Sequence, residues 1–159
     1  MVRRAYRALL LPVLIAALGC FLHGQTGKNI TIRVVDGRTG EVIKPSNVQV
    51  SLDRRESSHN EWVRQNEDGT ADLTVPEGTT EISVHATYDN STEYYINCDS
   101  AKLKNTSIEH WYAVTEILTA GVVTPNGCAK LKDVDRLKVD SKPGEFVLFV
   151  RKRNWREQN

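Results

Sequence analysis

The clearest strand in the sequence is Asn47-Val48-Gln49-Val50-Ser51-Leu52-Asp53. Apolar and polar side chains alternate along it, a period of two that is typical of a strand with one buried and one solvated face. Stretches of the same kind lie before and after it, so the sequence predicts a β-sheet protein. We expect Val48, Val50 and Leu52 to face the core and Asn47, Gln49 and Ser51 to face solvent.

Glycine, proline and Asx residues separate these stretches at short intervals. Asp68-Gly69 favours a β-hairpin between the strands on either side of it. Residues 146–150 are apolar on both faces, which indicates a central, covered strand. No helical periodicity follows residue 24, although 130–137 can form a turn or two. Seven or eight short strands predict a single all-β, Ig-like sandwich, with strands at 30–34, 47–53, 62–65, 71–75, 81–88, 93–98 and 146–150 and an apolar stretch of unassigned solvent face at 111–123.

The N-terminus carries a basic segment followed by an apolar one. Arg3, Arg4 and Arg7 precede the apolar run from Ala8 to Leu18, with no acidic residue among them. This is the pattern of a secretory signal peptide. The alternative is a retained membrane anchor, which needs about 20 apolar residues and reaches that length only if 19–22 are counted. We expect a signal peptide over 1–24, a β-sandwich domain over 28–152 and a basic tail over 153–159.

Two cleavage positions fit the sequence. The small residues Ala17 and Gly19 suit a cut that leaves Cys20 as the first residue. Ala-Leu-Gly-Cys then resembles a bacterial lipobox, which makes Cys20 a candidate lipidation site. A cut near Gly24 would instead discard Cys20 with the signal peptide. We leave both alternatives open and expect membrane contact only through such a lipid anchor.

Cys98 and Cys128 form the even pair that remains once Cys20 is lipidated or removed. Exported proteins fold in compartments that allow disulfides. We therefore predict a Cys98–Cys128 disulfide that closes a loop of about 30 residues. The alternative is two separately buried thiols.

The charges exclude partners that are held by a strong field. The chain has 21 basic and 20 acidic side chains, and removing the three arginines before Cys20 leaves 18 against 20, a balance of −2. Such a chain has no field to draw nucleic acid or an anionic membrane surface, so we expect no nucleic-acid partner. The basic stretch at 151–156 is a local exception, which we interpret as a solvated tail.

Two turn-and-core segments stand out, at Val35-Asp36-Gly37-Arg38-Thr39-Gly40-Glu41-Val42-Ile43 with Val48-Gln49-Val50, and at Asn66-Glu67-Asp68-Gly69-Thr70-Ala71-Asp72-Leu73-Thr74-Val75-Pro76-Glu77-Gly78. The first resembles the opening hairpin of the carboxypeptidase regulatory-like domain, a transthyretin-like β-sandwich of exported bacterial proteins. The second is similar to the D-G-x-x-x-L-x-V-P-x-G hairpin of the same family. The resemblance covers about residues 30–100 and implies the fold rather than an activity.

The sequence contains no motif that indicates catalysis or metal binding. His23, His59, His85 and His110 lack the i, i+2 or i, i+4 spacing of a local metal clamp, and no Gly-x-Ser-x-Gly elbow is present. Alternation places His85 beside Ser83 on the outward face of a strand, where we expect it to be solvated. We therefore expect no catalytic residue, no metal and no cofactor, and a protein that is not an enzyme.

Aromatic side chains give the better indication of function. Trp62, Tyr95 and Trp111 are candidate binding residues, because aromatic rings stack on sugars or line protein grooves; the alternative for Trp111 is a place in the core. We expect an exported module, periplasmic, envelope-anchored or secreted, that contacts a protein or glycan through loops or a sheet edge. The alternative is a carrier or sensor of a small ligand with a transthyretin-like shape.

Overall fold

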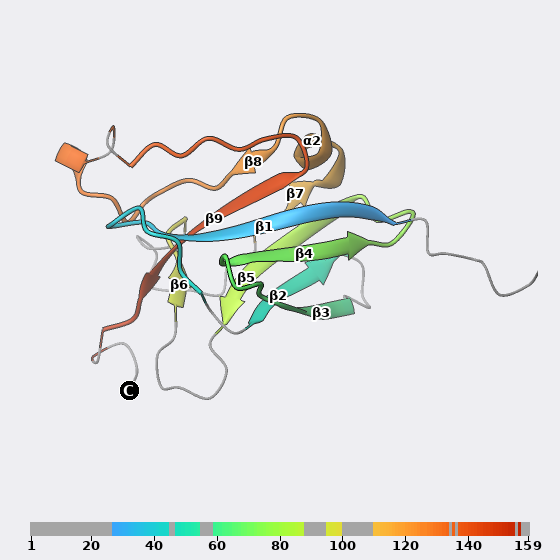
Figure 1. Ribbon diagram of the computed structural model, residues 1–159, viewed down its shortest axis with the longest axis horizontal. Coiled ribbons are helices and arrows are strands. Elements are labelled where there is room, and N and C mark those ends of the chain that lie inside the picture. Colours follow the sequence, from blue (N-terminus) through green and yellow to red (C-terminus); the bar gives the residue numbers. More distant parts are fainter. Residues whose placement is uncertain are drawn as a thin grey trace, which may run out of the picture.

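The computed structural model describes residues 27–44, 47–54, 59–87, 95–99, 110–133, 135, 137–154 and 156. In this part of the chain two β-sheets pack as a sandwich (Figure 1), so the predicted all-β sandwich is confirmed. The expected signal peptide and Cys20 lie outside the described residues. The strands are β1 (Lys28–Asp36), β2 (Asn47–Leu52), β3 (His59–Arg64), β4 (Thr70–Val75), β5 (Glu81–Thr87), β6 (Tyr95–Asn97), β7 (Tyr112–Ala113), β8 (Val122–Val123) and β9 (Glu145–Lys152), and the helices are α2 (Val114–Thr119) and the 3-10 helix η2 (Leu131–Asp133).

The two sheets have different strand orders. The first, which we call the β9 sheet, runs β4-β1-β9-β6, and the second, the β2 sheet, runs β3-β2-β5-β7. β1 and β9 are parallel, with Ile32 beside Phe146. The other long pairs, β1–β4, β2–β3 and β2–β5, are antiparallel. Parallel β8 borders the first half of the remaining edge of β9, and antiparallel β6 borders the second half.

The main core lies between the sheets and is built from the side chains that alternation places inward. Val48 and Val50 are fully buried and Leu52 nearly so, which confirms the inward set of β2. The outward set differs from the expectation, because Ser51 is only 3% exposed and its register partner Ser83 only 1%. Alternation reports the side to which a residue points, but not what covers that side.

β9 is covered on both faces, as its sequence predicts. Phe146, Leu148 and Val150 belong to the main core, whereas Val147 and Phe149 point to the other face of the sheet. All five are at most 3% exposed. A second, smaller core lies on that other face. It consists of Val35, Cys98, Val147 and Phe149, with Val123, Cys128 and Val139 packed against it.

An α-helix interrupts the apolar stretch at 111–123, where the sequence shows no helical periodicity. Val114 and Ile117 lie three residues apart in α2, and both are buried. Gly121 follows with φ of +77°, and a side chain there would come within 2.3 Å of the Lys142 carbonyl oxygen. β-branched residues favour strands, so tertiary packing, and not local propensity, selects this helix. No helix among the described residues has the length and apolar character needed to cross a bilayer.

Candidate functional site

A groove of about 590 Å³ lies between β3 and β4. Each of these strands is the last in its sheet, since β3 pairs only with β2 and β4 only with β1 among the described strands. Figure 1 shows β4 in the layer of β1, and β3 in the layer of β2 and β5. The lining consists of two consecutive runs, 61–64 on β3 and 72–74 on β4, completed by Gly27, Pro76 and Glu77.

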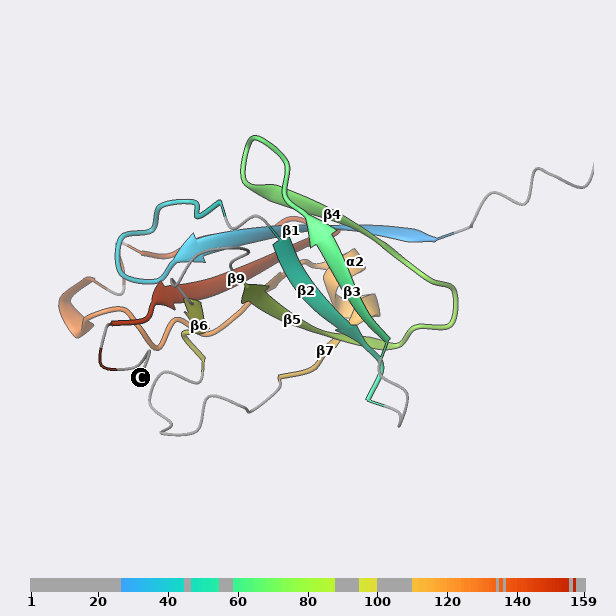
Figure 2. The same ribbon diagram turned by 90° about the horizontal axis from the view of Figure 1, so that it is seen from below.

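The groove exists because the chain turns tightly after β3 and the two strands then enter different sheets; the joining loop projects at the top of Figure 2. Gly69, with φ of +87°, donates its N–H to the Asn66 carbonyl at 3.1 Å, and Asn66 donates to the Thr70 carbonyl at 2.7 Å. The Thr70 N–H and hydroxyl both donate to Asp68 Oδ1, which lowers the pKa of Asp68. The predicted turn is confirmed, but the predicted hairpin pairing across it is wrong.

The hydrogen bonds of β1 determine which main-chain groups of β4 face the groove. The Thr31 N–H donates at 2.9 Å to the carbonyl oxygen of Gly144, the residue before β9. The main-chain groups of Thr31 therefore point towards β9. Neighbouring residues of a strand direct their main-chain groups to opposite sides. Ile30 therefore faces β4, where it is in register with Leu73. It follows that Asp72 and Thr74, which alternate with Leu73, direct their amide and carbonyl groups into the groove.

The same reasoning applies to β3. Asn66, just beyond the strand, donates its N–H towards β4, to Thr70. Trp62 and Arg64 lie four and two residues before Asn66, and residues at even spacing along a strand direct their main-chain groups to the same side. The main-chain groups of Trp62 and Arg64 therefore also point away from β2. Trp62 and Arg64, like Asp72 and Thr74 of β4, line the groove. The groove is thus bordered by two strand edges that no described strand covers.

Trp62 is the aromatic side chain at this groove. It is 61% exposed, an unusual exposure for a tryptophan. It lies on the outer face of β3, in register with Gln49 of β2. An exposed indole beside a groove can stack on a planar group or cover an apolar one. The sequence identified Trp62 as a candidate, and the fold places it at the edge of the sandwich.

The groove carries more negative than positive charge. Glu61, Asp72 and Glu77 line it, against the single cation Arg64. Glu61 is in register with Val50 and so points inward from an edge strand, where it is half-buried. Within the described residues, the side chains of Glu61, Arg64 and Glu77 have no hydrogen bond or ion pair. A ligand with cationic groups therefore fits the groove better than an anionic one.

Tyr95 and Trp111, the other candidate aromatics, lie elsewhere. Trp111 directly precedes β7, at the opposite edge of the β2 sheet from Trp62. It is half-buried, with the Arg54 guanidinium 5.7 Å from its ring centroid. Tyr95 lies on β6 and packs against the main core. The fold therefore does not gather the three predicted aromatics into one site.

A polar cluster that the sequence did not suggest joins β6 to β7. Asp99 Oδ2 lies 3.1 Å from His110 Nδ1 and accepts the Tyr112 hydroxyl at 3.2 Å. The Tyr112 ring packs edge-on against Phe146 of the core, 4.9 Å between centroids. Burial, and then the charge of Asp99, raise the pKa of Tyr112 above its usual value of 10. No local spacing announces this cluster, because its members come from two separate segments.

Tyr112 is expected to make the fold sensitive to high pH. Above about pH 10 the unfolded chain loses the phenol proton, whereas the folded chain keeps it, so unfolding becomes progressively more favourable. We expect the urea midpoint of the protein to fall more steeply between pH 10 and 12 than that of Tyr112→Phe. If the urea midpoints of the two proteins fell equally between pH 10 and 12, the pKa of Tyr112 would not be raised by the fold.

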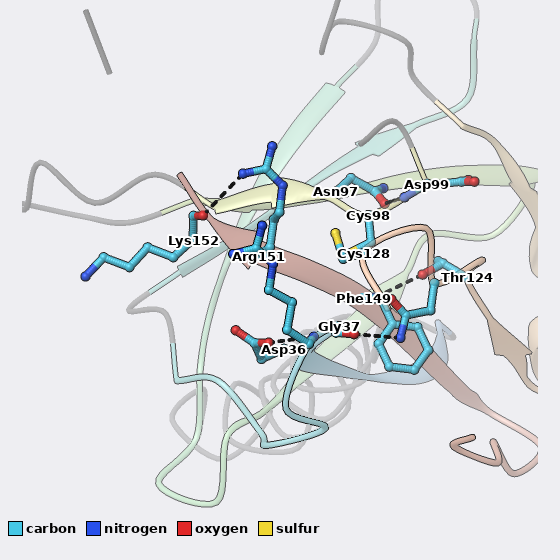
Figure 3. The surroundings of a disulfide bond; sticks show 12 residues. Asp36, Gly37, Asn97, Cys98, Asp99, Thr124, Cys128, Phe149, Arg151 and Lys152 are labelled. Carbon is cyan, nitrogen blue, oxygen red and sulfur yellow. Dashed lines mark hydrogen bonds between the residues drawn. A yellow bond between two sulfur atoms is a disulfide. The ribbon is translucent and has the colours of Figure 1, made fainter. Parts of the chain in front are cut away.

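The Cys98–Cys128 disulfide is present, as predicted, with a Cα–Cα distance of 5.1 Å and a separation of 30 residues (Figure 3). It lies in the smaller core. The Cys98 N–H donates to the Phe149 carbonyl at 2.9 Å, and the Phe149 N–H donates to Thr124 Oγ1 at 2.9 Å. A side chain at Gly37 would come within 2.6 Å of Cys98 Sγ. The bridge thus fixes the loop after β8 against β9.

The histidines do not assemble a metal or catalytic site in the described residues. His85 is half-buried, and its Nε2 lies 3.2 Å from the hydroxyl of Ser83. It lies on the outer face as expected, in register with Gln49, and is partly and not fully exposed. Ser83 is 1% exposed and so is not accessible as a nucleophile. No group of three His, Cys, Asp or Glu side chains with metal-binding geometry occurs in the described part of the chain.

A smaller cavity of about 230 Å³ lies under the loop that covers the smaller core. Its walls are mainly apolar and include Val123, Leu137, Val139 and Phe149. Pockets that enclose small organic ligands usually measure about 300–1,000 Å³. This cavity is therefore a weaker candidate than the groove at β3 and β4.

Comparison with known proteins identifies no relative. No family model, no curated protein and no solved structure matches the chain. The similarity of two segments to the carboxypeptidase regulatory-like domain therefore stays a prediction.

Proposed function

We propose that this chain is an exported, non-enzymatic binding or structural module of the cell envelope, which contacts its partner through the groove between β3 and β4. The observation that carries the proposal is an exposed tryptophan, Trp62, beside a groove bordered by two uncovered strand edges. Exposed aromatic residues at concave sites are common anchors of protein and glycan contacts.

Export is supported by the disulfide, which is typical of oxidising compartments, together with the basic-then-apolar N-terminus. The small-ligand carrier is the less favoured alternative, because the apolar cavity under the loop after β8 is smaller than the usual range.

Photo-crosslinking from position 62 tests the proposal. We expect the full-length protein with benzoylphenylalanine in place of Trp62 to form a defined adduct with an envelope component in its own cells. The same group in place of Leu131, which is 96% exposed and outside the groove, should form none. With that component purified, Trp62→Ala should weaken binding about thirty-fold, the loss typical of a central aromatic anchor.

Equal adducts from the two positions, or unchanged affinity of Trp62→Ala, would contradict the proposal. Because Trp62 is largely exposed, circular dichroism and the urea midpoint of Trp62→Ala should match those of the unmodified protein. The intact mass of the recovered protein also tests whether the N-terminal segment is removed, at which residue, and whether Cys20 is acylated.

A further inference from the structure

We propose that the groove binds an extended polypeptide segment of a partner protein, which adds as a further strand to β4 and brings a lysine or arginine side chain to Glu61. This inference rests on the proposed function, since it takes the groove as the binding site and names the class of ligand. The groove offers main-chain hydrogen-bonding groups in strand geometry, an inward-pointing carboxylate and an excess of negative charge.

The main-chain groups favour a polypeptide over a glycan. Asp72 and Thr74 direct two N–H and two C=O groups into the groove, spaced two residues apart on a regular strand. Alternate residues of any extended peptide present matching groups at the same spacing, roughly 7 Å. Addition of a strand to an open sheet edge uses such groups irrespective of the side chains. A sugar stacked on Trp62 has no regular row of donors and acceptors at this spacing.

β4, and not β3, is the edge that is open to a new strand. Natural sheets protect their edges with charged side chains that point inward, and Glu61 is such a residue on β3. The inward residues of β4 are Ala71, Leu73 and Val75, all apolar and at most 2% exposed. A strand added to β4 would extend the β9 sheet and continue its apolar inner face. The Asn66–Thr70 turn at one end and Pro76 at the other limit its length to about that of β4, six residues.

Glu61 determines which side chain the added strand should carry. Inward side chains of a strand on β4 would face the inward side of β3, where Glu61 and Val63 lie. Such a strand would remove water from the half-buried Glu61 carboxylate, and this costs free energy unless a cation replaces the water. Asp72 and Glu77 at the rim add to the preference for a basic ligand. The side chains of the ligand should therefore point alternately inward and outward, and the inward ones should be apolar or basic.

Selection from a peptide library tests this inference. The library consists of displayed hexapeptides with threonine at every second position and the other three positions varied. It is selected on the full-length, disulfide-bonded protein. Lysine or arginine should be enriched at one varied position. The selected peptides should bind Glu61→Gln about ten-fold more weakly, as expected for loss of a charged hydrogen bond. Glu67→Gln, an exposed acid outside the groove lining, is the matched control and should bind normally.

Two further measurements identify strand addition. A bound peptide should slow amide hydrogen exchange at Asp72 and Thr74, and N-methylation of its alternate amides should abolish binding. The inference is overturned if no peptide is retained, if acidic residues are enriched, or if exchange at Asp72 and Thr74 is unchanged. If one of these results is obtained while position 62 still forms its adduct, strand addition fails and the proposed function stands. Absence of any adduct at position 62 removes the proposed function itself.

Discussion

Removing the disulfide is expected to lower the free energy of unfolding by about 3.6 kcal/mol. A bridge that closes a loop of 30 residues restricts the unfolded chain, and the loop-entropy relation gives this value. Domains of this size have about 5–15 kcal/mol of stability in total, so the loss is a large share. Urea unfolding of Cys98→Ala/Cys128→Ala, compared with the unmodified protein, measures it.

Reduction provides the control for this experiment. A thiol reductant should shift the urea midpoint of the unmodified protein towards that of the double variant and should leave the variant unchanged. Alanine is preferred to serine because Cys98 is fully buried and a hydroxyl there would lack a partner. Coincident unfolding curves before and after reduction would contradict the expected role of the bridge.

The effect should begin in the smaller core. Loss of the bridge frees the loop after β8 from Cys98. Side-chain hydrogen bonds then remain to hold this loop: the Phe149 N–H donates to Thr124 Oγ1, and the Asn126 side-chain amide donates to the Gly37 carbonyl at 2.9 Å. The main core between the sheets does not contain Cys98 or Cys128. Amides of the loop should therefore exchange faster than those of β1 and β2 in the reduced protein.

Alternation was a good guide to the interior of the sandwich. Val48 and Val50 are inward and Phe146–Val150 is covered on both faces, because burial requires the period of two that the sequence displays. It failed where the outer face of the β2 sheet is covered at Ser51 and Ser83. Whether the outer face of a sheet is covered depends on the tertiary structure, and the sequence of the strand itself does not indicate it.

The candidate groove could be predicted only in part. Trp62 and the Asp68-Gly69 turn were recognised, because an isolated aromatic residue and an Asx-Gly dipeptide are local signals. The placement of β3 and β4 in two different sheets was not recognised. An Asx-Gly turn joins strands that pair with each other and also strands that belong to different sheets. That separation depends on the long-range pairing of β4 with β1, about 40 residues earlier in the chain. The short helix α2 was missed for the same reason.

Phe146→Ala is expected to be the most destabilising single substitution, costing about 3–5 kcal/mol. Phe146 is the largest fully buried side chain in the described part of the chain. It lies on the strand that joins β1, β6 and β8 into one sheet, and its ring meets Tyr112 edge-on. Truncation leaves a cavity between the sheets that the rigid strands around it cannot close. Equilibrium unfolding in urea, with the slope compared for both proteins, gives the loss.

Trp62→Ala is the matched control, because it removes a larger aromatic side chain from a mostly exposed position. Its cost in unfolding free energy should stay within about 0.5 kcal/mol, while Phe146→Ala should retain the binding surface as long as it remains folded. Stability and binding are thus expected to depend on different aromatic residues, one at the centre of the β9 sheet and one at the free edge of the β2 sheet. A large loss of stability in Trp62→Ala would instead make that side chain part of the core, and the groove would lose its anchor.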